Sequence, residues 1–178
     1  MKNLLFLPID LDTSYLNNLI LSNTEHKPIW NPFWSVSNVE LTVNILNFCE
    51  QLPIIKVDKF YFKTQFGNVG VHKDTNKSKC DPILYENLSS NEPAGFHIII
   101  KGSKNLLHVF NGESFIRASL PKTTNSYVMN ATETLHRVNE DENRQTIYIR
   151  GIIDSNRHKE FIKSNLEKYH NYAIYKKI

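Results

Sequence analysis

From about residue 54 the chain is a succession of short runs rich in β-branched and aromatic residues. The runs are IIKVDKFYFKTQF, GVHKD, AGFHIIIKG, NLLHVFNG, ESFIRASL, NSYVMNA, LHRVN and RQTIYIRGIID, and Gly, Asn, Pro and Ser separate them. This pattern is typical of strands joined by short turns. Asn111-Gly112, between two of the runs, is the strongest short hairpin signal. The sequence therefore predicts a compact set of antiparallel strands.

Apolar residues with helical spacing occur outside this β region. Segment 13–23 begins with a Ser/Thr cap signal, and segment 38–52 repeats the same spacing. Segment 155–175 places apolar residues such as Ile162 on one side of a third helix. Helices, then strands, then a closing helix predict an α+β, mainly β fold. We expect a double-stranded β-helix core, of the jelly-roll or cupin-like kind, with flanking N- and C-terminal helices.

Length and composition favour one globular domain. The 178 residues are 40% hydrophobic and 22% charged, and no repeat or Pro/Gly linker divides them. We therefore expect a single domain over residues 1–178, with its β core at about 54–154. The longest apolar runs, such as FHIII, are far too short to cross a bilayer. With no signal-peptide pattern and two cysteines that form no disulfide framework, the expected location is cytoplasmic.

The formal charge of +3 is too small to indicate nucleic-acid binding by itself. Lysines do gather between residues 56 and 79, including Lys63, but Asp58, Asp74 and Asp81 lie among them. A solvated face is the favoured interpretation of these lysines, and a basic substrate groove is the alternative.

The stretch VHKD is the most specific indication of function in the sequence. His72 and Asp74 are two positions apart in a predicted strand, so both side chains point to the same face and can aim two ligands at one metal ion. His136 opens another β run about sixty residues later, a gap that can hold the intervening strands of a barrel. Two histidines and one carboxylate form the facial triad of non-haem Fe(II) oxygenases, which leaves open positions on the metal. The competing interpretation is a surface His72–Asp74 pair that binds nothing.

The run after His136 predicts a polar interior beside these ligands. If residues 139–143 form a hairpin loop, His136 lies opposite Thr146. Alternation then separates two faces: Arg144, Thr146, Tyr148 and Arg150 on one, and Gln145, Ile147 and Ile149 on the other. An arginine can clamp a carboxylate bidentately, which suits the distal end of a bound 2-oxo acid. Arg144 is the favoured clamp, with Arg150 as its rival.

With these residues in place, the chain resembles the Fe(II)- and 2-oxoglutarate-dependent dioxygenases. The resemblance is greatest to the branch of aspartyl/asparaginyl β-hydroxylases and proline cis-hydroxylases, and it runs from about Val57 to Ile153. The matching motifs, in order, are VHKD, FHIII with His97, FNGE, YVMNATETLHRVN ending at His136, and the following Arg144. Where the branch often has an arginine two residues before the strand histidine, this chain has Gly95.

The resemblance implies an enzyme that hydroxylates a C–H bond and releases succinate and CO2. It implies Fe(II) on the two histidines and the aspartate, and 2-oxoglutarate held by Arg144 with Thr146. His97 would hydrogen-bond this cosubstrate, and a satisfied core histidine is the alternative interpretation. The implied substrate is a small molecule, such as an amino acid, or a peptidyl side chain, with O2 consumed and ascorbate as a reductant. A nucleic-acid substrate stays open, no membrane partner is expected, and the oligomeric state cannot be read.

Two other functions compete with this interpretation. A cupin-like metalloprotein that does not use 2-oxoglutarate usually carries H-x-H with a following glutamate, a pattern absent here. A non-catalytic β-sandwich binding module would leave the histidines and aspartate incidental. Tyr61 and Gln65 are further candidates for the pocket wall. The aromatic stretch from Trp30 to Trp34 is interpreted as an anchor for a loop, with a substrate wall as the alternative.

Overall fold

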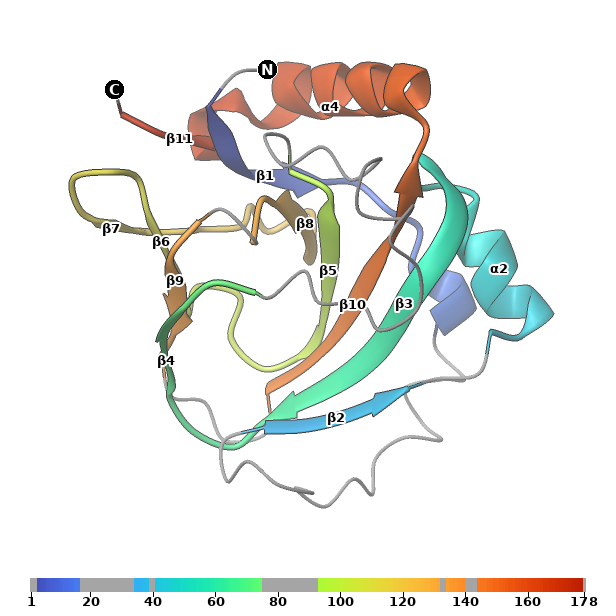
Figure 1. The fold of residues 1–178 in the computed structure, drawn as a ribbon, viewed down its shortest axis with the longest axis horizontal. Helices are drawn as coiled ribbons and strands as arrows, with labels where there is room; N and C mark the ends of the chain where they lie inside the picture. The colour runs from blue at the N-terminus through green and yellow to red at the C-terminus, as the bar shows by residue number, and fades with distance from the viewer. Residues whose placement is uncertain are drawn as a thin grey trace.

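Two antiparallel sheets form the framework of the part of the chain that the structure describes. The structure is a computed structural model, and it describes residues 3–16, 34–38, 41–74, 93–131, 134–139 and 144–177. Within these ranges the larger sheet has seven strands, in the order β11-β1-β8-β5-β10-β3-β2, and the smaller has four, in the order β4-β9-β6-β7. The smaller sheet stands opposite the larger one (Figure 1), so the fold is a mainly β sandwich.

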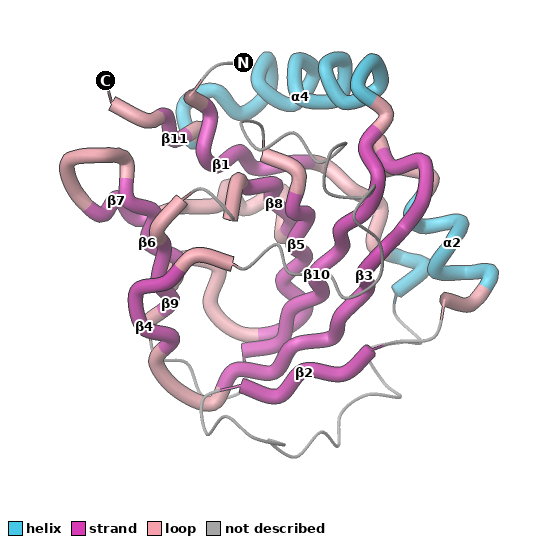
Figure 2. Tube along the Cα trace, in the orientation of Figure 1, coloured by secondary structure: helices cyan, strands magenta, loops and turns pink. Residues whose placement is uncertain are grey.

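The strands of the larger sheet are β1 (Leu4–Ile9), β2 (Trp34–Asn38), β3 (Ile54–Gln65), β5 (Gly95–Lys101), β8 (Ser126–Met129), β10 (Arg144–Ile153) and β11 (Ile174–Tyr175). Those of the smaller sheet are β4 (Val69–His72), β6 (Leu107–Phe110), β7 (Phe115–Arg117) and β9 (His136–Val138). The described helices are α2 (Val43–Cys49), α4 (Ser155–Tyr169) and two 3-10 turns, Ser14–Leu16 and His170–Tyr172 (Figure 2).

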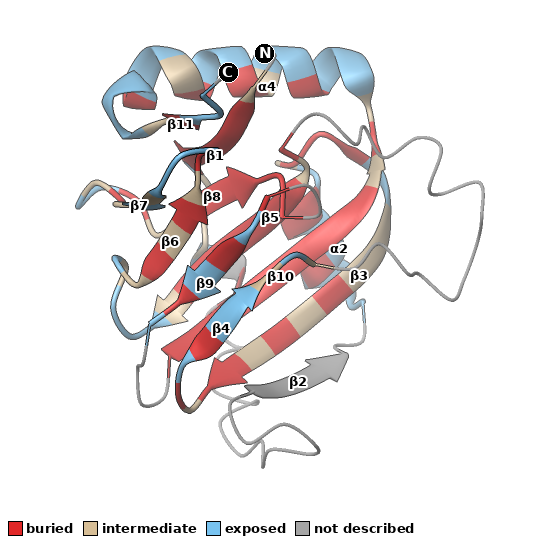
Figure 3. Ribbon diagram, turned by 60° about the vertical axis from the view of Figure 1, so that its left-hand side comes forward, coloured by how far each residue is buried: buried red, intermediate tan, exposed pale blue. Residues whose placement is uncertain are grey.

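The larger sheet separates two different interiors. On one face Phe96, Ile98, Ile147 and Ile149 pack with apolar residues of α2 and α4 in the main core. Side chains at the alternate positions face the smaller sheet, where a second apolar cluster includes Val109. Because both faces are covered, β10 is buried along nearly its whole length (Figure 3).

Capping residues fix where the helices begin. The Thr42 hydroxyl accepts a hydrogen bond of 3.4 Å from the backbone N–H of Ile45, so α2 begins at the residue after Thr42. The Asp154 carboxylate accepts bonds of 3.0 and 3.1 Å from the N–H groups of Asn156 and Arg157 at the start of α4. Among the residues that the structure describes, neither helix has the length and apolar character that a membrane span requires.

Two of the three predicted helices are shorter than the apolar spacing predicts. Of the predicted helix 13–23, the described part contains a 3-10 turn at Ser14–Leu16, and the part from residue 17 lies outside the described residues. The predicted helix 38–52 is α2 alone. The predicted helix 155–175 stops at Tyr169, because the chain beyond it forms a 3-10 turn and then pairs with β1 as β11. Pairing with a distant strand overrides the local helical pattern there.

One of the two predicted hairpins is confirmed and the other is wrong. At Asn111-Gly112, β6 pairs with β7, the Asn111 side chain accepts two backbone N–H groups of the turn at 3.0 Å, and Gly112 has a φ of +108°. After His136, however, β9 pairs with β4 and β6 in the smaller sheet, whereas β10 pairs with β3 and β5 in the larger one. The predicted pairing of His136 with Thr146 is therefore wrong.

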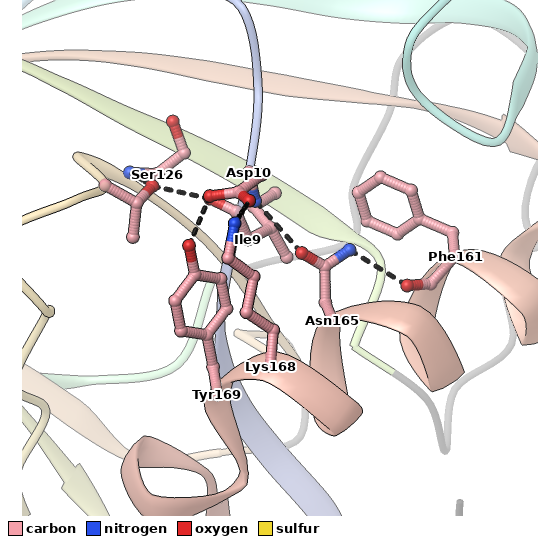
Figure 4. Close-up of polar contacts among 8 residues, drawn as sticks. Ile9, Asp10, Ser126, Phe161, Asn165, Lys168 and Tyr169 are labelled. Atoms are coloured by element: carbon pink, nitrogen blue, oxygen red, sulfur yellow. Dashed lines mark hydrogen bonds and ion pairs between the residues drawn. The ribbon is translucent and has the colours of Figure 1, made fainter.

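Polar contacts join α4 to the end of β1, a strand that the sequence pattern does not show. The Asp10 carboxylate accepts hydrogen bonds from Lys168 and Tyr169, and its backbone N–H donates to the Asn165 side chain at 2.9 Å (Figure 4). Burial alone would raise the pKa of Asp10, but the bonds from Lys168 and Tyr169 outweigh it and lower that pKa.

The aromatic stretch from Trp30 to Trp34 is only partly described. Its residues 30–33 lie outside the described part of the chain, and Trp34 begins β2.

Candidate metal centre

An irregularity in β4 turns His72 into the space between the sheets. Two residues, Gly70 and Val71, stand opposite a single residue of β9, which is the signature of a β-bulge. Val69 and His72 consequently share the inner face although they are three positions apart. Val69 is buried, whereas Val71 is 53% exposed. With regular alternation, both valines would point inward and His72 would point out.

The three predicted ligands converge. His72 on β4 is the direct partner of His136 on β9, and their ring centroids are 4.2 Å apart. The Asp74 Oδ1 atom lies 3.5 Å from Nε2 of His72 and 3.6 Å from Nε2 of His136. One ligand atom from each residue lies within 4.8 Å of the other two. The backbone N–H of Asp74 donates to the Ala131 carbonyl at 2.9 Å, which ties the carboxylate to this position.

Backbone carbonyls orient both imidazoles for metal binding. Nδ1 of His72 lies 2.7 Å from the Gly70 oxygen, and Nδ1 of His136 lies 3.0 Å from the Thr134 oxygen. A carbonyl oxygen only accepts, so each Nδ1 donates to it, and each Nε2, once deprotonated, offers a lone pair on the Asp74 side. Such second hydrogen bonds are typical of metal-ligating histidines. The residues therefore fit one metal ion held by two imidazoles and a carboxylate.

The electrostatics of the site favour the metal-binding forms of two ligands. Burial alone would raise the pKa of Asp74, but the hydrogen bond with His72 and the charges of Lys63 and His136 lower it strongly. The same hydrogen bond raises the pKa of His72. Burial lowers the pKa of His136. At neutral pH Asp74 is thus ionised and His136 neutral, while His72 retains its proton more readily than an ordinary histidine.

A cavity of about 200 Å³ adjoins the three ligands between the two sheets. Its wall also contains the three residues predicted to hold the cosubstrate, namely His97, Arg144 and Thr146. Tyr61 and Gln65, the other candidates, are not among its lining residues. Gln65 instead donates to the carbonyl of Gly67 and, at 2.8 Å, to that of Asn139.

The two candidate clamp residues have different surroundings. Arg144 lines the cavity and is 3% exposed, and its Nε and Nη2 atoms have no hydrogen-bond partner among the described residues. It does hydrogen-bond the Tyr127 hydroxyl. Arg150 donates from Nη2 to the Asp58 carboxylate at 3.2 Å and does not line the cavity. Of these two arginines, Arg144 is the one that lines the cavity beside the metal ligands, and two of its donor atoms have no partner among the described residues.

His97 is held between two aromatic rings. Its ring stacks on Tyr127 with centroids 4.6 Å apart and planes 6° apart, and Tyr148 lies at 4.8 Å on a tilted plane. Burial keeps the pKa of His97 well below its usual value, so the imidazole is neutral. Its Nε2 has no hydrogen-bond partner among the residues described. A Cβ at Gly95 would stand 3.1 Å from the Tyr148 ring, so a side chain there would require that ring to shift by a few tenths of an ångström.

The sequence interpretation missed part of the cavity wall. The unpredicted lining residues are Lys63, Leu107, Tyr127, Met129 and Val138. A solvated face was the favoured interpretation of Lys63 and a basic groove the alternative. In the structure β3 places Phe60 and Phe62 in the main core and Lys63 on the cavity wall. That alternation was a readable signal, because two phenylalanines at even positions leave the odd positions for the other face.

No family model matches the sequence, and no curated protein is significantly similar to it. The function of the chain is therefore inferred from the arrangement of the site.

Proposed function

We propose that this chain is an Fe(II)- and 2-oxoglutarate-dependent oxygenase that hydroxylates a C–H bond, built on a double-stranded β-helix core of the jelly-roll type. One observation carries the proposal. A two-histidine, one-carboxylate cluster and a buried arginine with unpartnered donors face the same small cavity. The first feature suits a catalytic metal, and the second suits an anion bound beside it.

The ligand set supports a catalytic rather than a structural metal. Structural zinc sites are closed by four protein ligands, whereas a catalytic ion keeps positions for substrate. Here three ligands cluster among the described residues and a cavity lies next to them. Two imidazoles with one carboxylate are the ligands of non-haem Fe(II) oxygenases. Asp74 also fills the position that a halide would need, which supports hydroxylation over halogenation.

Arg144 supports a dicarboxylic cosubstrate. A buried guanidinium without an anion is costly, and a carboxylate matches its two unpartnered donors in a bidentate pair. Thr146 and the neutral His97 add a hydroxyl and an imidazole to the same wall. The volume of about 200 Å³ equals that of about seven water molecules. This suits a small 2-oxo acid that reaches from the metal to Arg144.

The chain's own residues would divide the work as follows. A bound Fe(II) would supply the activation of O2 that C–H hydroxylation requires. Arg144 and Thr146 orient the cosubstrate, while Leu107, Met129 and Val138 line the cavity with apolar surface. The His72 side chain is 33% exposed and that of His136 only 6%, so substrate approaches from the His72 side.

An anaerobic titration tests this function. Fe(II) and 2-oxoglutarate added to the wild type should produce the weak visible charge-transfer band of the chelate, and O2 should then yield succinate. Asp74→Ala should lose iron, whereas Arg144→Met should keep iron and bind 2-oxoglutarate poorly. Arg150→Met is the matched control and should still bind both if it folds.

Two results would contradict the proposal. Iron binding without the band in the wild type would favour a cupin-like metalloprotein that ignores the oxo acid. Absence of both iron binding and the band would favour a non-catalytic β-sandwich module. If Arg150→Met and not Arg144→Met lost 2-oxoglutarate, the clamp assignment would be wrong.

A further inference from the structure

The smaller sheet has an outer face that no described α-helix covers. Both α2 and α4 pack on the larger sheet, away from this face (Figure 1). Along β9, His136 and Val138 are buried, so the exposed Arg137 between them points outward. Along β6, Leu107 and Val109 are buried in the second apolar cluster. The alternate residues of β6, and their direct partners on β7, therefore belong to the outer face.

Basic side chains form one row across this face. His108 on β6 is paired directly with Arg137 on β9 and with Arg117 on β7. Directly paired residues point to the same side, so the two arginines flank the histidine about 10 Å apart, which is two strand spacings. Both arginines are exposed, and neither forms an ion pair with a described residue. The four strands contain no aspartate or glutamate, and Glu113 in the adjacent turn is paired with Lys177 at 2.6 Å.

Aromatic rings form a second row beside the first. Phe110 on β6 is the direct partner of Phe115 on β7, and their ring centroids are 5.3 Å apart on planes tilted by 51°. Both side chains are half-buried, so each ring keeps part of its surface open to solvent. The guanidinium carbon of Arg137 lies 5.0 Å from the centroid of the Phe115 ring. The arginine thus reaches from the first row to the second, and the ring holds its charged group in place.

Rings beside arginines narrow the choice of partner. Unpaired bases stack on aromatic rings and on guanidinium planes, while arginines pair with the phosphates between them. An acidic peptide would satisfy the arginines but offers no repeated flat surface to the rings. A second copy of the chain fits poorly, because a symmetric dimer through this face would bring the arginines of both copies together. The face therefore matches a strand of unpaired nucleic acid best.

We propose that the outer face of the smaller sheet binds single-stranded nucleic acid. Arg117 and Arg137 pair with its phosphates, and its bases stack on Phe110 and Phe115. This inference does not depend on the function proposed above. Arg137 follows the candidate ligand His136 but points to the opposite side of β9, so a bound strand lies outside the sandwich and leaves the cavity open. The contacts involve backbone phosphates and ring faces, so binding should tolerate many base sequences.

Fluorescence anisotropy of labelled oligouridine and oligothymidine, each of about twelve nucleotides, measures binding to the metal-free full chain. The wild type should bind at least one of them, more weakly as salt rises. Arg117→Gln and Arg137→Gln should each weaken binding at least about fivefold and reduce the slope of log K against log salt concentration by about 0.7. Lys163→Gln removes an exposed charge from α4 and is the matched control, which should bind within about twofold of the wild type.

Substitution of Phe110 tests the rings separately from the arginines. Phe110→Leu keeps an apolar side chain but removes the stacking surface, so binding should weaken at least about fivefold while the salt slope stays the same. Phe110→Tyr keeps the ring and should bind within about twofold of the wild type. Thermal melting of each variant checks that it is folded.

Four results would overturn the inference. The first is that the wild type binds neither oligonucleotide. The second is that Lys163→Gln weakens binding as much as the arginine variants, which would indicate attraction by overall charge. The third is that polyglutamate competes as well as oligouridine and Phe110→Leu binds normally, which would favour an acidic protein partner. The fourth is a wild-type dimer in sedimentation experiments that Phe110→Leu dissociates, which would make this face a contact between copies.

Discussion

Two buried arginines on the same face of β10 should respond in opposite ways to the same substitution. Two donor atoms of Arg144 have no acceptor among the described residues, whereas Arg150 is ion-paired with Asp58. An unsatisfied buried donor costs about 1–3 kcal/mol. Cavity water reduces this cost, and the bond to Tyr127 contributes about 1 kcal/mol in the other direction. We therefore expect Arg144→Met to raise the free energy of unfolding by about 1–2 kcal/mol.

Arg150→Met should do the reverse. The side chains of Arg150 and Asp58 are only 5% and 9% exposed, so removal of the arginine leaves a buried carboxylate without its counter-charge. Breaking such a pair costs about 3–5 kcal/mol.

Urea unfolding of the metal-free proteins at pH 7 measures both effects. Thermal melts should show Arg144→Met about 2–8 °C above the wild type, since 1 kcal/mol shifts the melting temperature of a chain this size by about 2–4 °C. A clear loss of stability in Arg144→Met, with little change in Arg150→Met, would contradict these assignments. Arg144 would then be a structural residue rather than one that waits for an anion.

Three further predictions concern the bulge, the ligand pKa values and the α4 contact. Of the two valines beside the bulge, only Val69 faces inward. In urea unfolding, Val69→Ala should therefore lower the free energy of unfolding by about 1–2 kcal/mol, and Val71→Ala by less than about 0.5 kcal/mol. Equal losses would contradict the bulge. Because the hydrogen bond with Asp74 raises the pKa of His72 above 6.5 and metal requires the neutral ring, Zn(II) affinity measured by calorimetry should already fall before the pH has dropped to 6.5. A flat profile down to pH 5.5 would contradict that assignment. Tyr169→Phe removes the hydroxyl that donates to Asp10, so it should lower the free energy of unfolding by about 1 kcal/mol. Lys168 is exposed, so Lys168→Met should change this free energy little. The opposite order in urea unfolding would show that the lysine holds α4 in place.

Alternation along single strands was the most dependable part of the sequence interpretation. The expected division of β10 is found, with Ile147 and Ile149 in the main core and Arg144 and Thr146 on the cavity wall. The three residues predicted as metal ligands do lie together in one cluster. These predictions held because the period of a strand is local and does not depend on which strands it joins.

Pairing between strands could not be read in the same way. The hairpin predicted around residues 139–143 fails because β9 and β10 find their partners far away in sequence, in different sheets. β1 was missed, since Pro8 and the flanking aspartates obscure a six-residue strand. The bulge at Gly70 and Val71 turns His72 inward, and Gly70 was its one signal in the sequence, since a glycine inside a strand pattern often marks a bulge.

The anomalous signal of Mn(II) soaked into crystals would show whether the three predicted ligands hold one metal ion. We expect one strong peak per chain, bonded to Nε2 of His72, Nε2 of His136 and the carboxylate of Asp74, beside the cavity that Arg144 lines. A peak bonded elsewhere, or one that His136 does not reach, would contradict it.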